Sequence, residues 1–178
     1  MKKKLLFNNY LSQYCEMLNG TTQIEALLKK IYNFKKKREG KIILLGNGGS
    51  SSICSHIATD LTKSNNIRAI SLSDHNLITC FGNDYGFENW MSKALEAHCD
   101  YNKDLVIMIS SSGNSKNLIN AAKLCKKKKI SIITMTGFDK KNSLSAYGDI
   151  NVWVNSKSYN YVEVAHLQIL AFIVDTLK

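Results

Sequence analysis

The chain alternates between short apolar runs and longer stretches whose apolar residues recur at helical spacing. Each apolar run is bounded by glycine or by polar residues, and few charges interrupt it. Runs of this length and composition are typical of strands that are buried on both faces of a sheet. The pattern predicts five strands, at residues 41–46, 67–72, 104–110, 130–137 and 149–155.

Helices are predicted between these strands and ahead of the first one. The first 38 residues form an amphipathic pair, in which one helix ends at Gly20 and the next restarts after a threonine cap and ends at Gly40. The other helical stretches are residues 51–65, 74–84, 86–99, 116–129 and 160–178.

A regular alternation of buried strands with helices favours a parallel sheet that is covered by helices on both faces. We therefore predict an α/β fold, a three-layer sandwich with a five-stranded parallel sheet in a flavodoxin-like arrangement. No linker or change in composition divides the chain. The prediction is a single domain over residues 1–178, with an N-terminal helical segment at 1–38 and an α/β core at 41–178.

The formal net charge is +10, and much of it lies in short lysine runs at the ends of predicted helices. Cations are favourable at helix C-termini. The runs are not interleaved with the aromatic residues that single-stranded nucleic acids require for stacking. We interpret the charge as solvated helix ends that also attract anionic metabolites, and nucleic acid is not favoured as a partner.

The expected compartment is the cytoplasm. No apolar run approaches the roughly 20 residues that a membrane-spanning helix needs, and the basic N-terminus lacks the apolar segment of a signal peptide. The five cysteines are scattered and form no CxxC pair, which is typical of reduced thiols and not of a disulfide frame or a zinc ribbon. We therefore expect no membrane partner.

Two loops rich in glycine and serine carry the candidate chemistry. LLGNGGSSS (residues 44–52) and MISSSGNSKN (residues 108–117) each follow a predicted strand and open a helix. Backbone N–H groups at a helix N-terminus, together with serine hydroxyls, bind phosphate well. Neither loop is a P-loop or a GxGxxG motif, so a dinucleotide is not favoured. Such residues also form ordinary turns, but two of these loops at one sheet edge favour a phosphate site.

Three segments resemble the motifs of the sugar isomerase (SIS) domain in order and spacing: GNGGSSSICSHIATDL, NDYGFE and ISSSGNSKN. Within that family the likeness is to the phosphoheptose isomerases, which convert sedoheptulose 7-phosphate to a heptose 7-phosphate. The resemblance implies a five-stranded parallel sandwich and a homotetramer with active sites between subunits. It also implies an enediolate mechanism and a role in making heptose for lipopolysaccharide or capsule.

The resemblance also implies roles for individual residues. Asp60, Glu163 and Asp84 are the expected catalytic residues, with Asp60 as the base. His56, Asp60 and Glu163 are the expected ligands of a zinc ion, and His56 and Asp60 share one helix face because they are four residues apart. The expected substrate-binding residues are Asn47, Gly48, Ser50, Ser110, Ser111, Ser112 and Ser115.

Two positions depart from the family pattern. Asp60 stands where the family has a glutamate, and Ala171 stands where the phosphoheptose isomerases have their catalytic histidine. The loss of one acid–base group slows an isomerase by about 10²–10⁴-fold without abolishing binding. Two alternatives therefore stay open: a non-catalytic module that binds a sugar phosphate or a protein partner, and an isomerase for a different phosphosugar.

Overall fold

The computed structural model describes residues 2–178, and side chains from residue 6 onward. The first half of the chain contains α1 (Lys2–Asn19), α2 (Ile24–Lys37), β1 (Ile42–Gly46), α3 (Gly48–Asn65), β2 (Ala69–Ser71) and α4 (His75–Tyr85). The second half contains α5 (Trp90–His98), β3 (Leu105–Ser110), α6 (Lys116–Lys128), β4 (Ser131–Thr136), β5 (Ile150–Trp153) and α7 (Tyr159–Thr176).

The five strands form one parallel sheet in the order β2-β1-β3-β4-β5. This confirms the predicted α/β fold and each predicted strand, although the strands are shorter than the apolar runs that marked them. Two helix starts differ more: α5 begins at Trp90, four residues after its predicted start, and α3 begins at Gly48, three residues before its predicted start. The glycine–serine stretch after β1 is thus the first turn of a helix, and only Asn47 separates it from the strand.

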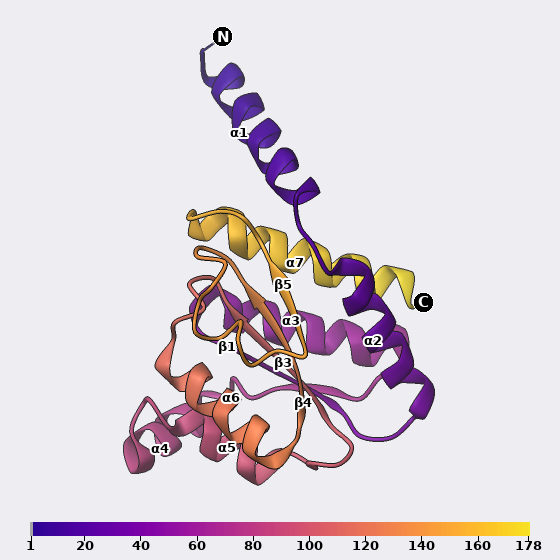
Figure 1. The fold of residues 1–178 in the computed structure, drawn as a ribbon, viewed down its shortest axis with the longest axis vertical. Coiled ribbons are helices and arrows are strands. Elements are labelled where there is room, and N and C mark those ends of the chain that lie inside the picture. The colour runs from indigo at the N-terminus through magenta and orange to yellow at the C-terminus, as the bar shows by residue number, and fades with distance from the viewer. Residues whose placement is uncertain (1) are drawn as a thin grey trace.

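In the central strands β1, β3 and β4, alternate residues point to opposite faces of the sheet and enter two separate cores. Ile42 and Leu44 of β1 pack with apolar residues of α2, α3 and α7, whereas Ile43 and Leu45 pack with those of α5 and α6. Figure 1 shows these helices as two layers with the sheet between them. Burial on both faces explains why the strands read as continuous apolar runs.

The first helix leaves this body and projects away from it, as Figure 1 shows. From Tyr10 onward it is attached: the Tyr14 hydroxyl donates to Gln168 Oε1 at 2.7 Å, and the Tyr10 and Tyr14 rings pack edge-on against Tyr161 of α7. Toward the N-terminus α1 carries a stripe of exposed apolar side chains: Leu6, Phe7, Tyr10 and Leu11.

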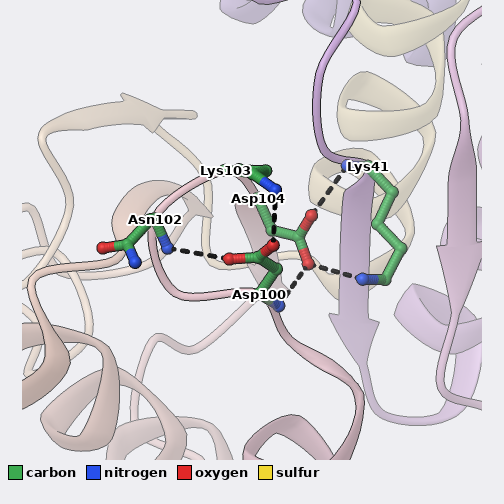
Figure 2. A network of polar contacts seen from close by, with 5 residues as sticks. All are labelled: Lys41, Asp100, Asn102, Lys103 and Asp104. Carbon is green, nitrogen blue, oxygen red and sulfur yellow. Dashed lines mark hydrogen bonds and ion pairs between the residues drawn. The ribbon is translucent and has the colours of Figure 1, made fainter.

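A buried carboxylate ties β1 to β3 at the amino end of the sheet. Asp104, whose side chain is 1% exposed, accepts hydrogen bonds from the backbone N–H and the Nζ of Lys41 at 2.8 and 2.6 Å. It also accepts one from the Asp100 N–H at 2.8 Å, and Figure 2 shows these bonds converging on its two oxygens. Charge-assisted bonds of this kind fix the entry of both strands and therefore their register.

Candidate active site

The loops after β1 and β3 lie at the point where the strand order reverses. From β1 the chain continues to β2 on one side of the sheet, and β3 lies on the other side. α3 packs into one core and α6 into the opposite one. The two loops therefore diverge at the carboxyl end of the sheet, where open α/β folds bind their ligands.

A cavity of about 110 Å³ occupies this position. Its lining combines hydroxyl, amide and carboxylate groups with one tyrosine and one isoleucine. Seven of the predicted site residues line it: Asn47, Ser50, Ser110, Ser111, Ser112, Ser115 and Glu163. Gly48 opens α3 beside it, and Ile109 and Tyr159 complete the wall.

Serine hydroxyls from the end of β3 to the start of α6 surround one side of the cavity. Ser110 Oγ lies 3.4 Å from Ser115 Oγ and accepts a hydrogen bond from the Gly113 N–H at 3.2 Å. The hydroxyl of Ser111 is buried and has no hydrogen-bond partner among the residues that the structure describes. A buried polar group without a partner costs about 1–3 kcal/mol, so a bound oxyanion would stabilise this loop.

Two helices begin at the cavity without a side-chain cap. Asn47 and Ser115 occupy the N-cap positions of α3 and α6, and neither side chain bonds to the first turn of its helix. By contrast, Asp74 and Ser158 cap α4 and α7. The N-termini of α2 and α5 also lack a side-chain cap, but Gln23 and Asn89 do not line this cavity. The N–H groups at the starts of α3 and α6, of which the Leu118 N–H donates to Asn117 Oδ1 at 2.9 Å, give the cavity the positive potential that an anion requires.

The side chain of Asn47 joins the two loops. Its amide exchanges hydrogen bonds with the amide of Asn117, at 3.0 and 2.9 Å. Asn117 lies in the first turn of α6 and is 3% exposed, so the pair holds the start of α3 against the start of α6. Asn117 was not among the predicted site residues. It lies inside the second motif, but nothing else in the sequence distinguishes it from its neighbours there.

Glu163 places a carboxylate at the N-terminus of α3. It comes from the first half of α7, and a Cβ at position 49 would overlap its carboxyl group, so any larger residue there would displace the carboxylate. The N–H groups of the first helical turn favour a negative charge at this point. Of the nine residues that line the cavity, Glu163 is the only carboxylate.

The other predicted catalytic residues lie outside this cavity. His56 and Asp60 form a pair with 3.3 Å between Nε2 and Oδ2, on a face of α3 where 61% of the His56 side chain is exposed. Asp60 is eleven residues beyond Gly49, which is about 16 Å along a helix axis. Asp84 is exposed on α4 and accepts a hydrogen bond from Asn83 Nδ2 at 3.0 Å. Their catalytic roles stay predictions.

The expected zinc ligands do not come together within one chain. His56 and Asp60 supply a nitrogen and a carboxylate on the middle of α3, while Glu163 lies at the start of that helix. Over the described part of the chain, no three side chains of the metal-binding types gather closely enough to hold an ion. A single subunit therefore does not fit a three-ligand zinc site.

No histidine lines the cavity, and the nearest candidate on α7 cannot substitute. His166 is fully buried, and its Nε2 lies 3.3 Å from the carbonyl oxygen of Thr136. Burial lowers the pKa of His166 to about 4, so the imidazole is neutral at pH 7. Ala171 is half-buried further along α7, in the stretch that runs beside the second half of α3.

Comparison with known proteins identifies the family to which the chain belongs. Residues 7–137 match the family of the SIS domain. The chain is 32% identical over 184 residues to a phosphoheptose isomerase of Sulfurimonas denitrificans, covering 100% of this chain and 91% of that protein. It is 30% identical over 185 residues to one of Buchnera aphidicola subsp. Acyrthosiphon pisum, covering 98% and 95%.

A solved structure of a phosphoheptose isomerase from Francisella tularensis superposes with a TM-score of 0.85 at 25% identity, covering 99% of this chain and 96% of that one. The fold, the match over residues 7–137 and the near full-length likeness agree. The chain belongs to the SIS domain family.

The contact between Gly49 and Glu163 leads to a prediction about activity. A Gly49→Ala substitution should displace the carboxylate of Glu163, which is predicted to be catalytic, and should lower kcat for isomerase turnover by about tenfold to a hundredfold, because small displacements of a catalytic group are costly. The free energy of unfolding should stay constant or rise, since alanine is the better helix former by about 1 kcal/mol.

The control for this experiment is Gly82→Ala, because a Cβ there meets no atom within 4 Å. Steady-state kinetics and urea denaturation of both variants separate the two effects. A Gly49→Ala protein with unchanged kcat would contradict the assigned position of Glu163.

His166 gives a prediction about pH. The unfolded chain binds a proton at this histidine below its ordinary pKa of about 6.5. The folded chain does so only below about pH 4. Stability therefore falls as the pH drops through this window, and wild type should lose about 2 kcal/mol more than His166→Leu between pH 7 and pH 5. Equal losses in urea denaturation of the two proteins would contradict the buried neutral imidazole.

Proposed function

We propose that the chain isomerises sedoheptulose 7-phosphate to a heptose 7-phosphate. The observation that carries this proposal is the cavity in which an unpartnered serine hydroxyl and two uncapped helix N-termini lie beside one carboxylate. The relatives of 30% and 32% identity are both phosphoheptose isomerases and match over nearly their whole length. The serine loop holds the phosphate, and Glu163 faces the carbons that react.

The reaction moves a proton between two neighbouring carbons. A base removes the proton from the carbon next to the ketone, an enediolate forms, and the proton returns to what was the carbonyl carbon. Glu163 is placed to carry that proton, because it is the only carboxylate in the cavity. The free N–H groups at the start of α3 lie beside it and stabilise the negative charge that develops on the enediolate oxygens.

In the assembled protein, the His56–Asp60 face of one subunit would complete the cavity of another. This arrangement explains why these residues form an exposed pair and do not enter the cavity of their own chain. Asp60 then serves as a second proton carrier, and Asp84 lines the sugar. We also propose that His56 and Asp60 bind zinc in the assembled protein. The family resemblance is the sole support for this part of the proposal.

The assembly itself is proposed to be a homotetramer. The stripe of Leu6, Phe7, Tyr10 and Leu11 on α1 is an exposed apolar surface, although one side of it meets Tyr161 through the Tyr10 ring. A second copy of the chain is the natural occupant, because burial of these side chains would recover about 1.5–3 kcal/mol for each large one.

We further propose that the product enters the synthesis of heptose for lipopolysaccharide or capsule and that the protein acts in the cytoplasm. In the described residues, no helix combines the length and apolarity that a bilayer crossing requires.

A non-catalytic module that binds a sugar phosphate is the second candidate function. The observation in its favour is the absence of histidine from the cavity lining, together with Ala171 on α7. Such a module would keep the serine loop and lose turnover. Binding and turnover must therefore be measured separately.

The enzyme proposal predicts turnover of sedoheptulose 7-phosphate by the wild type. Glu163→Gln should lower kcat by at least about 10²-fold. Ser111→Ala should weaken binding by about tenfold to a hundredfold, since it removes one hydrogen bond to a charged group. Coupled kinetics and calorimetry give the two quantities, and Glu96→Gln on the exposed face of α5 is the matched control. Tight binding without turnover in the wild type would favour the module.

The assembly proposal predicts a mass of four chains of 20.0 kDa by light scattering. Phe7→Glu/Leu11→Glu introduces charge into the apolar stripe and should lower that mass. Asn8→Glu/Ser12→Glu adds the same charge on the opposite face of α1 and should leave it unchanged. A wild-type protein that is monomeric at micromolar concentration would contradict this proposal.

A further inference from the structure

One wall of the cavity is aromatic, and no sequence motif marks it. Tyr159 is the first residue of α7 and the only aromatic residue among the nine that line the cavity. Its side chain is 58% exposed, so the ring stands at the mouth of the cavity. Glu163 follows four residues later on the same helix face, which places the ring and the carboxylate on one side of the bound molecule.

A second aromatic residue holds the Tyr159 ring. The rings of Phe138 and Tyr159 meet edge to face, with centroids 4.8 Å apart and an interplanar angle of 66°. This geometry is favourable for aromatic pairs. Phe138 follows β4 at the carboxyl end of the sheet. Tyr159 is therefore supported from the same end of the sheet at which the serine loop lies.

The backbone of Phe138 is strained. Its φ is +52°, in the left-handed region, which is unfavourable for a residue with a bulky side chain. Two hydrogen bonds keep it there: its N–H donates to the Ser156 carbonyl at 2.9 Å, and its carbonyl accepts from Trp153 Nε1 at 3.3 Å. Strained backbone held in this way is common beside ligand sites.

The residue before Phe138 attaches this turn to the serine loop. The Gly137 N–H donates to the carbonyl oxygen of Ser111 at 2.9 Å. A Cβ at position 137 would lie 2.6 Å from Val162 Cγ2, so the turn also packs tightly on the first part of α7. The serine loop, the strained turn and Tyr159 therefore form one connected unit.

We propose that Tyr159, seated by Phe138, holds the carbon chain of the phosphosugar between the serine loop and Glu163. This inference rests on the proposed function and names the part of the substrate that the serines do not contact. The ring face packs against the C–H groups of the chain, and the hydroxyl reaches the solvent or a sugar hydroxyl. Tyr159 is thus a positioning residue that distinguishes a phosphosugar from phosphate alone.

The test compares two ligands in the full-length protein: sedoheptulose 7-phosphate and inorganic phosphate. Tyr159→Ala should weaken sugar-phosphate binding in calorimetry by about three- to tenfold, the value of one aromatic contact. It should leave inorganic phosphate affinity unchanged. Tyr159→Phe should keep most of the affinity, and Phe138→Leu should reproduce part of the loss with little added effect in the Tyr159→Ala background.

Tyr101→Ala is the matched control. Tyr101 precedes β3 at the amino end of the sheet, away from the cavity, and its ring packs under Lys128. Equal weakening of both ligands by Tyr159→Ala, or no weakening of either, would overturn the inference. Because the experiment measures binding, it tests the role of Tyr159 even if the protein binds the sugar phosphate without turning it over. Failure of the enzyme proposal would be seen separately, in kcat.

Discussion

Five residues of β1 pair in parallel with β3, and this pairing decides where the chain can hold an anion. Gly46 lies opposite Ile109, so the two strands end side by side and their helices start from neighbouring points on opposite faces of the sheet. The Asp104 carboxylate fixes the pairing at the amino end, and the Asn47–Asn117 amide pair closes it at the carboxyl end. Together with the strand pairing, both contacts hold the two uncapped helix N-termini side by side.

The charge distribution of the site follows from that arrangement. Uncapped N–H groups attract both the phosphate of a substrate and the carboxylate of Glu163. Glu163 comes close because position 49 is a glycine. In the proposed complex, the serine loop would hold the phosphate, and Tyr159 would cover the less polar part of the sugar. The serine hydroxyls, the Glu163 carboxylate and the Tyr159 ring thus lie around one cavity of about 110 Å³.

The strands, the serine loop and the His56–Asp60 pair could be predicted from local patterns in the sequence. Each of these features depends on residues that are close together in the chain. The course of α7 beside α3 is a tertiary property. It places Glu163 at Gly49 and leaves Asp60 about 16 Å further along, which no spacing in the sequence indicates. Asn117 and Tyr159 were missed for the same reason, since only packing brings an α6 amide and an α7 ring to the cavity.

The most direct test of this account is a crystal structure of the protein with sedoheptulose 7-phosphate bound. The account predicts the phosphate group among Ser110, Ser111, Ser112 and Ser115, at the N-terminus of α6. It also predicts the carbonyl end of the sugar within hydrogen-bonding distance of Glu163. A sugar phosphate bound elsewhere, with this cavity filled only by water, would contradict the account.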